Sequence, residues 1–227
     1  MNRKKVILVL VDGPSDEQAL GLALSNVFDS NTVRIEVLHH DITSEHGIKP
    51  GNIVSAINKI LKAFLENNKY IKKSDILRII HIVDTDGAFI PEDCIEEDKT
   101  VKEWIYTESK IIAESKQAVI DRNQRKSVNI IRLISTNEIN KIPYGIFYMS
   151  CNLDVVLYGK YNSTDEEKEQ NAYEFASKYK DDKDGFITFI SNNSFSVSGD
   201  YRETWKFIRK DHNSLIRYSN IHISFLP

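Results

Sequence analysis

The stretch RIIHIVDTDGAFI, Arg78–Ile90, decides the fold that the sequence predicts. Its apolar run, 77–83, is short and rich in β-branched residues, which is typical of a buried strand in a parallel sheet. The run stops at Asp84, and the sequence Asp-x-Asp-Gly that follows predicts a turn, because Gly87 is free to take a positive φ. Ligands of open α/β sheets bind at the carboxyl ends of the strands, so Asp84 and Asp86 are candidate ligands for Mg²⁺ or Mn²⁺. The alternative is a turn in which both side chains only accept hydrogen bonds from backbone amides.

A second apolar run, KVILVLV at 5–11, also ends in an acidic glycine turn, DGPSD at 12–16. Ser15 and, three residues later, Gln18 predict a capping box at the start of the following helix. A third strand is expected at 33–38, and the apolar spacing within 51–67 predicts an amphipathic helix. The order β-α-β-α-β with right-handed crossovers predicts a parallel, doubly wound sheet.

The remainder of the chain predicts a helical insertion and an extension after the central domain. The individual expectations are an insertion at 91–127 that is helical from Thr100 onward, strands at 128–134 and 144–149, a turn into a short helix at 150–157, a helix at 163–180, a strand at 186–190, a helix at 201–210 and an edge strand at 221–225. The predicted fold class is therefore α/β, a Rossmann-like fold with a mainly parallel central sheet. Residues 1–160 would form one domain with its insertion, and 161–227 an α+β extension packed on the same domain.

The composition says little about function, but it argues against a secreted, disulfide-bonded or membrane-spanning protein. With 227 residues, 41% hydrophobic and 28% charged, the chain can bury a core without disulfides or a structural metal. Cys94 and Cys151 have no pairing pattern and fit a reducing, cytoplasmic location, and we expect neither a signal peptide nor a membrane helix. The net charge of −3 means that any surface for nucleic acid must be a local patch.

Four carboxylates follow strands that are predicted to be neighbours: Asp12, Asp84, Asp86 and Asp154. A site with these carboxylates and no evident His or Cys ligands suggests one or two Mg²⁺-like ions, which suit an in-line phosphoryl displacement. Because the carboxylates repel one another without a cation, we expect Asp86→Asn to leave the metal-free fold unchanged or more stable.

These motifs resemble the Toprim domain, which is shared by topoisomerases, DnaG-type primases, small nucleases and the overcoming-lysogenization-defect (OLD) nucleases. VDGPSD at 11–16 is similar to the first Toprim motif and VDTDG at 83–87 to the second, while CNLDVVLY at 151–158 looks like the third acidic motif of OLD-type nucleases. The resemblance covers roughly residues 4–160. It departs from the family where Asp12 and Asp154 stand in place of the usual Glu, which shortens the reach of both carboxylates.

The resemblance implies a metal-dependent nuclease that cleaves DNA or RNA, with Mg²⁺ or Mn²⁺ bound by the four carboxylates. It also implies that Lys160 stabilises charge on the phosphate. No G-x-x-x-x-G-K-[ST] motif occurs, so the OLD-type ATPase domain is absent from this sequence. Stand-alone Toprim proteins of this kind are often paired with a separate ATPase in phage-defence systems, which makes an ATPase a candidate partner.

Several polar residues outside the four carboxylates are weaker candidates for a role at the site. His39 and His40 end a strand at the same edge, and Asp41 beside them is a candidate outer-sphere group. Ser15 and Asp16, in the first turn of a helix, are candidate phosphate contacts. A basic face with helical spacing is a candidate nucleic-acid contact, although a solvated helix face is the more common meaning of such a pattern; it consists of Arg202, Lys206 and Arg209.

Two other functional classes remain open from the sequence. A phosphatase of the haloacid-dehalogenase type would use Asp84 as nucleophile and Asp86 as acid/base, but Ala88 replaces the Thr of its Asp-x-Asp-Gly-Thr motif and the first acidic turn is left unexplained. The other class is a non-catalytic Toprim interaction module. Release of phosphate from an aryl phosphate, compared with plasmid nicking, distinguishes the first alternative, and a metal-induced rise in melting temperature argues against the second.

Overall fold

The central element is a mixed, mostly parallel sheet with strand order β2-β1-β3-β8-β7, in a computed structural model that describes residues 5–28, 33–39 and 41–225. The strands of this sheet are β1 (Lys5–Val11), β2 (Val33–His39), β3 (Ile76–Asp84), β7 (Glu138–Ile139), β8 (Ile142–Ser150) and β9 (Tyr218–Ser219). The four long strands β2, β1, β3 and β8 run parallel, and the short β7 and β9 pair antiparallel with β8. The chain therefore has an α/β fold, and the predicted strands 5–11, 33–38 and 77–83 are confirmed with small shifts at their ends.

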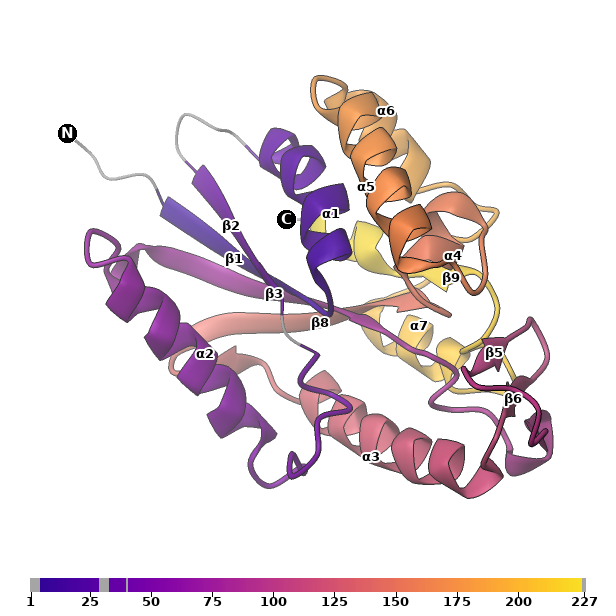
Figure 1. The fold of residues 1–227 in the computed structure, drawn as a ribbon. Coiled ribbons are helices and arrows are strands. Elements are labelled where there is room, and N and C mark those ends of the chain that lie inside the picture. The colour runs from indigo at the N-terminus through magenta and orange to yellow at the C-terminus, as the bar shows by residue number, and fades with distance from the viewer. Residues whose placement is uncertain (1–4, 29–32, 40, 226–227) are drawn as a thin grey trace.

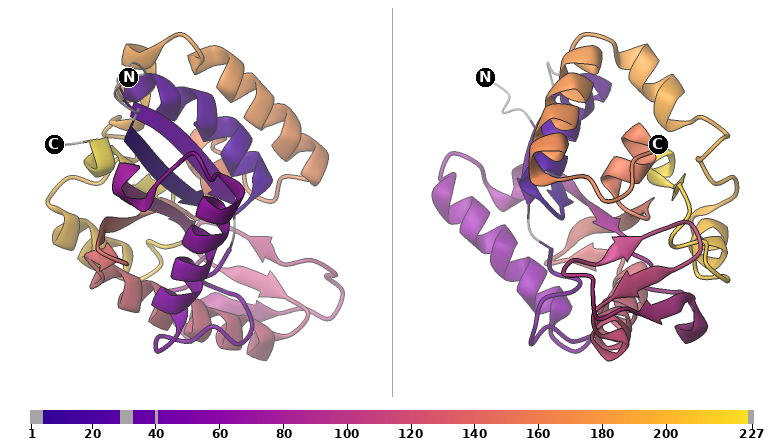
Figure 2. Two further views of the ribbon diagram at one scale, coloured as in Figure 1. Left: turned by 90° about the vertical axis from the view of Figure 1, so that its left-hand side faces the viewer. Right: turned by 45° about the vertical axis from the view of Figure 1, so that its right-hand side comes forward.

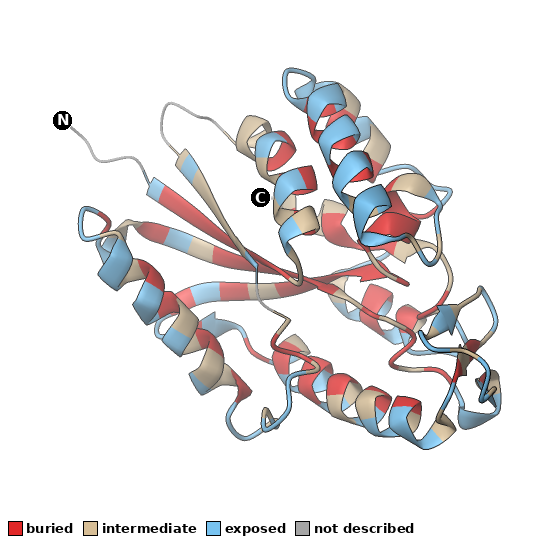
Figure 3. Ribbon diagram, in the orientation of Figure 1, coloured by how far each residue is buried: buried red, intermediate tan, exposed pale blue. Residues whose placement is uncertain are grey.

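Helices cover both faces of this sheet (Figure 1). The helices are α1 (Pro14–Val27), α2 (Ile53–Asn67), α3 (Lys116–Ile134), α4 (Leu153–Tyr158), α5 (Asp165–Tyr179), α6 (Lys183–Ile190) and α7 (Tyr201–Ile208). Helices α1, α4, α5 and α6 share one apolar core with the sheet, and α2, α3 and α7 share the other. The alternation of side chains along β1 explains this arrangement, because Leu8 and Leu10 face the second core while Val9 and Val11 face the first. The central strands β1, β3 and β8 are accordingly mostly buried, whereas the edge strand β2 is only partly covered (Figure 3).

The strand order places a crevice at the carboxyl ends of β1 and β3. The chain runs β1-α1-β2-α2-β3-α3-β8, while the strands lie in the order β2-β1-β3-β8. The direction of winding thus reverses between β1 and β3, with α1 on one face and α2 and α3 on the other (Figure 1). Such a reversal point is where ligands bind in open α/β sheets.

The predicted insertion is shorter than 91–127, and its helix begins at Lys116 instead of Thr100. Residues after the second acidic turn form a separate three-stranded sheet of β4 (Ile95–Glu97), β6 (Ile111–Ala113) and β5 (Ile105–Tyr106), which projects beside the main sheet (Figure 2). Its own small core includes Ile95 and Ile111 and is closed by Leu215 from the C-terminal segment. Residues 116–127 of the predicted insertion belong to α3, which is the crossover helix between β3 and β8.

The strand expected at 128–134 is wrong, because these residues are the C-terminal half of α3. The β-branched and apolar residues VNIIRLI favour a strand when read alone. In the helix, Ile130 and Leu133 pack against the sheet while Val128 and Ile131 remain exposed. Docking of one face of the helix therefore overrides the local preference for a strand.

The C-terminal segment is more helical than expected. The predicted strand at 186–190 is helix α6, which buries Phe186 and Ile190, and the predicted edge strand at 221–225 is a 3₁₀-helix, η3 (Ile221–Phe225). Both sequences are short apolar runs, which do not separate strand from helix by periodicity. Two further 3₁₀ turns are η1 (Lys73–Asp75) and η2 (Glu92–Cys94). None of the helices in the described residues combines the length and the apolar character that crossing a membrane requires.

Candidate functional site

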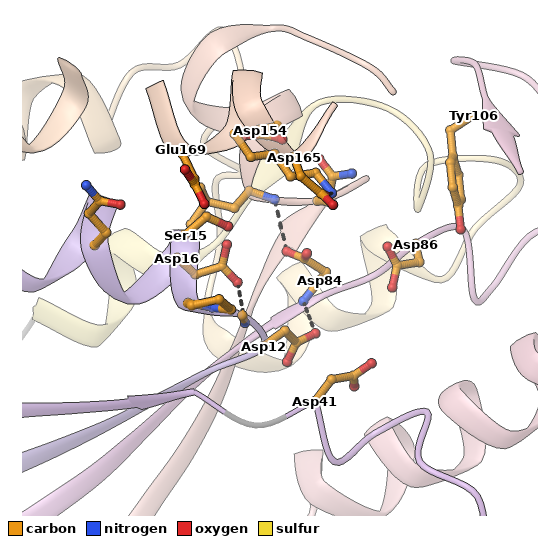
Figure 4. A pocket seen from close by; sticks show the side chains of 16 residues that line it. Asp12, Ser15, Asp16, Asp41, Asp84, Asp86, Tyr106, Asp154, Asp165 and Glu169 are labelled. Atoms are coloured by element: carbon orange, nitrogen blue, oxygen red, sulfur yellow. Dashed lines mark hydrogen bonds and ion pairs between the residues drawn. The ribbon is translucent and has the colours of Figure 1, made fainter. Parts of the chain in front are cut away.

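The parallel strands carry carboxylates to one edge of the sheet, in the order in which the strands lie. Asp41 follows β2, Asp12 follows β1, Asp84 ends β3, and Asp154 lies in the first turn of α4, directly after β8. They border a cavity of about 740 Å³ (Figure 4). Its lining consists of Asp12, Gly13, Pro14, Ser15, Asp16, Gln18, Asp41, Asp84, Asp86, Tyr106, Asn152, Leu153, Asp154, Asp165, Lys168 and Glu169. The structure thus brings the four carboxylates singled out in the sequence into one cavity, together with Ser15 and Asp16.

The first acidic turn is held by contacts within itself. Pro14 is the first residue of α1, a position where its missing N–H is not needed. The Asp16 carboxylate accepts a hydrogen bond of 2.9 Å from the backbone N–H of Gly13, which caps the helix. The capping box expected from Ser15 and Gln18 is therefore wrong, since the N-cap is Gly13, two residues earlier, and Ser15 lies inside the first turn.

The second acidic turn is held by contacts with distant segments. Asp86 and Gly87 both have positive φ, 47° and 68°, and a Cβ at Gly87 would lie 2.7 Å from Leu215 Cδ2. The Thr85 hydroxyl donates a hydrogen bond of 2.7 Å to the backbone carbonyl of Ser214. The turn is therefore locked by the chain that follows α7 as well as by its own glycine.

The two turns are joined through Asp12 and Asp84. The backbone N–H of Asp84 donates to Asp12 Oδ2 at 3.1 Å. The Asp84 carboxylate accepts a hydrogen bond of 2.9 Å from the backbone N–H of Leu153, which is the first residue of α4. Figure 4 shows Asp12, Asp16 and Asp84 grouped together, with Asp86 on the side of Tyr106. The carboxyl ends of β1, β3 and β8 are thereby fixed relative to one another.

A buried lysine that the sequence did not reveal contacts this group. Lys126, on α3, is fully buried, and its Nζ lies 2.5 Å from Asp86 Oδ2, 3.4 Å from Asp12 Oδ2 and 4.0 Å from Asp41 Oδ1. Arg122, one turn earlier, lies 3.4 Å from Asp86 Oδ2. Asp86 is therefore ion-paired, and the expectation that Asp86→Asn relieves repulsion needs correction, since the change would remove the partner of a buried ammonium.

The pattern on α3 explains why Lys126 was missed. The face that this helix buries consists of Val119, Asn123, Lys126, Asn129, Ile130 and Leu133. Three of these residues are polar and interrupt the apolar stripe. Asn123 donates to the Gly87 carbonyl at 3.1 Å, so Asn123 and Lys126 both contact the second turn, while Asn129 donates to the Thr43 carbonyl. A helical spacing that includes these polar residues is the sequence pattern that would have predicted a buried lysine at this site.

Burial and mutual repulsion raise the pKa of several carboxyl groups. Burial raises the pKa of Asp84 well above its ordinary value, and the nearby carboxylates, Asp16 first, add to the effect. Burial likewise raises the pKa of Asp12, although the Lys126 ammonium opposes the shift. The pKa of Asp16 rises to about 6 through burial, against the lowering effect of its Gly13 hydrogen bond. Burial raises the pKa of Asp154 too. A bound cation would offset the burial and the mutual repulsion of these carboxylates.

Asp41 differs from these groups because it faces Lys126. Burial alone would raise its pKa, but the lysine charge and hydrogen bonds from Ser44 and Thr43 outweigh burial and lower the pKa to about 2. Lys126 responds in the complementary way: burial would lower its pKa, and the surrounding carboxylates raise it instead. The Lys126 ammonium and the Asp41 carboxylate are therefore charged at neutral pH.

The remaining residues predicted for the site do not line the cavity. Lys160 donates to Asn171 Oδ1 at 3.0 Å, and Lys168 is the basic residue of the lining instead. The basic residues Arg202, Lys206 and Arg209 are exposed on α7, outside the lining. His39 lies 2.7 Å from Glu17 Oε2 and is not part of the lining. His40 lies outside the described residues.

The donor chemistry of the cavity suits a hard divalent cation. Within the described residues, no group of three or more His, Cys, Asp or Glu side chains is arranged to hold a metal ion by itself. Mg²⁺ does not require such a group, because it is usually bound by one or two carboxylates together with water and substrate phosphate. Asp12 Oδ1 is buried and has no hydrogen-bond partner among the described residues. Asp12 and Asp84, which are joined by a hydrogen bond, therefore fit such an ion.

Comparison of the chain with models of protein families, with curated proteins and with solved structures finds no match. The similarity to the Toprim domain thus remains a likeness of short motifs.

Proposed function

We propose that the chain is a metal-dependent phosphodiesterase of the Toprim type that cleaves DNA or RNA. The observation that carries the proposal is the convergence of Asp12, Asp16, Asp84 and Asp154 on one cavity at the reversal point of the sheet. Their pKa values are all raised. A fold that retains buried, mutually repelling carboxylates at a ligand-binding edge is typical of a site that works with a bound cation.

The charge of the cavity indicates why a nucleic acid would need that cation. Eight of the sixteen lining residues are acidic, and Lys168 is the one basic residue among them. Without a divalent ion this surface repels a phosphate backbone. We therefore expect the binding of nucleic acid to the chain to depend on Mg²⁺ or Mn²⁺, and not only its cleavage.

The residues of the chain have distinct roles in this proposal. A divalent ion would supply Lewis-acid activation of the phosphate and a water of lowered pKa. Asp84, whose carboxylate accepts the Leu153 N–H, and Asp12, whose carboxylate accepts the Asp84 N–H, would hold this ion. Asp154 orients the reacting groups from the side of α4. Lys168, at the rim, is placed to attract the phosphate.

The test is cleavage of supercoiled plasmid DNA and of a structured RNA by the purified chain with Mn²⁺. Asp84→Asn keeps the size of the side chain and should abolish cleavage, because it removes the charge at the centre of the site. Asp184→Asn, on the exposed surface of α6, is the matched control and should cleave as the wild type does. Equal cleavage by wild type and Asp84→Asn would refute the proposal.

Two further arms of the experiment separate the alternatives. Release of phosphate from an aryl phosphate, without nicking of plasmid, would favour the phosphatase. No cleavage, and no rise in melting temperature with Mn²⁺, would favour a non-catalytic module. Because a separate ATPase in a phage-defence system is part of the Toprim proposal, the assay is repeated with any ATPase that co-purifies with the chain.

A further inference from the structure

The carboxylates of the cavity fall into two groups that differ in their counter-ions. Asp86 and Asp41 lie within 4.0 Å of the Lys126 ammonium. Asp16, Asp84 and Asp154 form no ion pair with any described residue, and Asp16 and Asp84 instead accept hydrogen bonds from backbone N–H groups. Figure 4 shows the same division, with Asp16 and Asp84 toward α1 and α4 and with Asp86 and Asp41 away from them.

Asp12 belongs to both groups. Its Oδ2 contacts Lys126 and accepts the Asp84 N–H, whereas its Oδ1 is buried without a hydrogen-bond partner among the described residues. The Asp12 side chain is only 9% exposed, so bulk water does not satisfy Oδ1. One oxygen of this carboxylate is therefore neutralised by the chain itself, and the other still lacks a partner.

Lys126 contacts the carboxylates as a bridging metal ion would. A two-ion phosphodiesterase places two cations ~3.5–4 Å apart, with carboxylates shared between them. The Lys126 Nζ lies between Asp12 and Asp86, which come from the ends of β1 and β3. A second divalent ion between these two carboxylates would need the space of the ammonium and would be repelled by its charge.

We propose that Lys126 takes the place of one of the two cations that this carboxylate cluster needs, so that the chain binds one divalent ion, beside Asp12 and Asp84. This inference rests on the proposed metal-dependent function and specifies the number of ions at that site. Lys126 is a positioning residue here: it holds Asp86 and Asp12 and leaves Asp84 for the metal. Asp86 then forms an ion pair with Lys126 and does not bind the metal ion, although the sequence motif predicts it as a metal ligand.

The test is the stoichiometry of Mn²⁺ binding to the whole, metal-free chain. Free Mn²⁺ is followed by electron paramagnetic resonance during a titration, and isothermal calorimetry gives the affinity. We expect the wild type to bind one ion. Asp86→Asn should keep that ion with an affinity within about threefold of the wild type, and Asp84→Asn should lose it. If two ions share the cluster, Asp86→Asn loses at least one of them instead.

Removal of the ammonium is the complementary test. Lys126→Met keeps the length of the side chain without its charge, and we expect this variant to bind two Mn²⁺ ions. Lys110→Met is the matched control, since Lys110 is an ion-paired lysine of the inserted sheet that does not line the cavity, and it should still bind one ion. If Lys126→Met does not fold, the comparison of Asp86→Asn with Asp84→Asn still shows whether Asp86 is a metal ligand.

The outcomes separate this inference from the function on which it rests. Two ions in the wild type, or one ion in a folded Lys126→Met with unchanged affinity, would overturn the inference and leave a metal-dependent enzyme intact. No Mn²⁺ binding in any variant would overturn both. One ion in the wild type that is lost in Asp84→Asn and kept in Asp86→Asn would support the inference, whichever substrate is cleaved.

Discussion

The two acidic turns of the site have similar sequences but are held in different ways. The first, 12–16, is fixed by its own residues: Pro14 starts the helix and Asp16 accepts the Gly13 N–H. The second, 84–87, depends on segments far away in the chain, because α3 supplies Lys126 and residues 214–215 pack on Thr85 and Gly87.

This difference explains how the cavity combines free and neutralised carboxylates. The hydrogen bond from Gly13 holds Asp16 in place without a counter-ion, so Asp16 remains without an ion pair among the described residues and burial raises its pKa. The second turn has Asp86 in a left-handed conformation that costs energy, and the ion pairs with Lys126 and Arg122 help to hold it there. The contrast predicts that changes in distant residues should harm the second turn far more than the first.

The largest expected effect is that of Lys126→Met on the stability of the metal-free protein. The change leaves the buried Asp12 carboxylate without a cation and the Asp86 carboxylate with Arg122 alone, which should lower the free energy of unfolding by about 3–5 kcal/mol. Urea denaturation measures the loss, and Lys110→Met, an exposed pair, should change stability by less than about 1 kcal/mol. The double variant with Asp86→Asn should recover part of the loss. A loss below about 1 kcal/mol in Lys126→Met would mean that the second turn does not depend on α3.

A smaller effect is expected from Gly87→Ala. A side chain at this position must adopt a positive φ, which lowers the free energy of unfolding by ~1–2 kcal/mol. Its Cβ would also lie 2.7 Å from Leu215 and 3.0 Å from Ile111, and such overpacking lowers the free energy of unfolding by a further ~1–3 kcal/mol. Gly159→Ala is a close control, because Gly159 has nearly the same φ, 69°, and nothing within 4 Å of its Cβ position. The difference between the two variants in urea denaturation isolates the packing of the second turn. Equal losses would show that residues 214–215 do not lock it.

The smallest effect concerns the pH dependence that the first turn contributes. The pKa of Asp16 is raised from 3.8 to about 6 in the folded state, so between these values the folded state binds more protons than the unfolded state. Stability therefore falls as pH rises through this window, by about 2–3 kcal/mol at ~1.4 kcal/mol per unit. Asp16→Asn keeps the acceptor for the Gly13 N–H and should remove this part of the pH dependence.

Asp41→Asn is the control for the same measurement. The pKa of Asp41 is lowered to about 2, so its contribution to stability is present above its ordinary value and is lost only as pH falls below 3.8. Asp41→Asn should therefore leave the pH dependence of stability between pH 3.8 and 6 unchanged. Urea denaturation of metal-free protein across pH 3–7 tests both variants, and a profile for Asp16→Asn that matches the wild type would contradict the assignment. Saturating Mn²⁺ should flatten the wild-type profile.

The sequence by itself determined the parallel strands and the acids at their ends. Buried parallel strands read as continuous apolar runs, and the turn residues that stop them, such as Gly13 and Gly87, act locally. Since the carboxyl ends of parallel strands share one edge, the meeting of Asp12 with Asp84 followed from the order of the elements. Short apolar runs such as 128–134 and 186–190 were ambiguous, because their local preference does not separate a strand from one face of a docked helix.

Only the tertiary structure decided which charges meet. Lys126 lies 40 residues after Asp86 on a helix whose buried face mixes polar and apolar residues, and nothing in the local sequence indicates that its ammonium reaches Asp12. Likewise, Leu215 closes on Gly87 from the far end of the chain. Ion pairs and close contacts of this kind depend on how whole elements dock, and docking is set by burial summed over many residues. The sequence therefore located the carboxylates, while the fold determined which of them have a counter-ion within the chain.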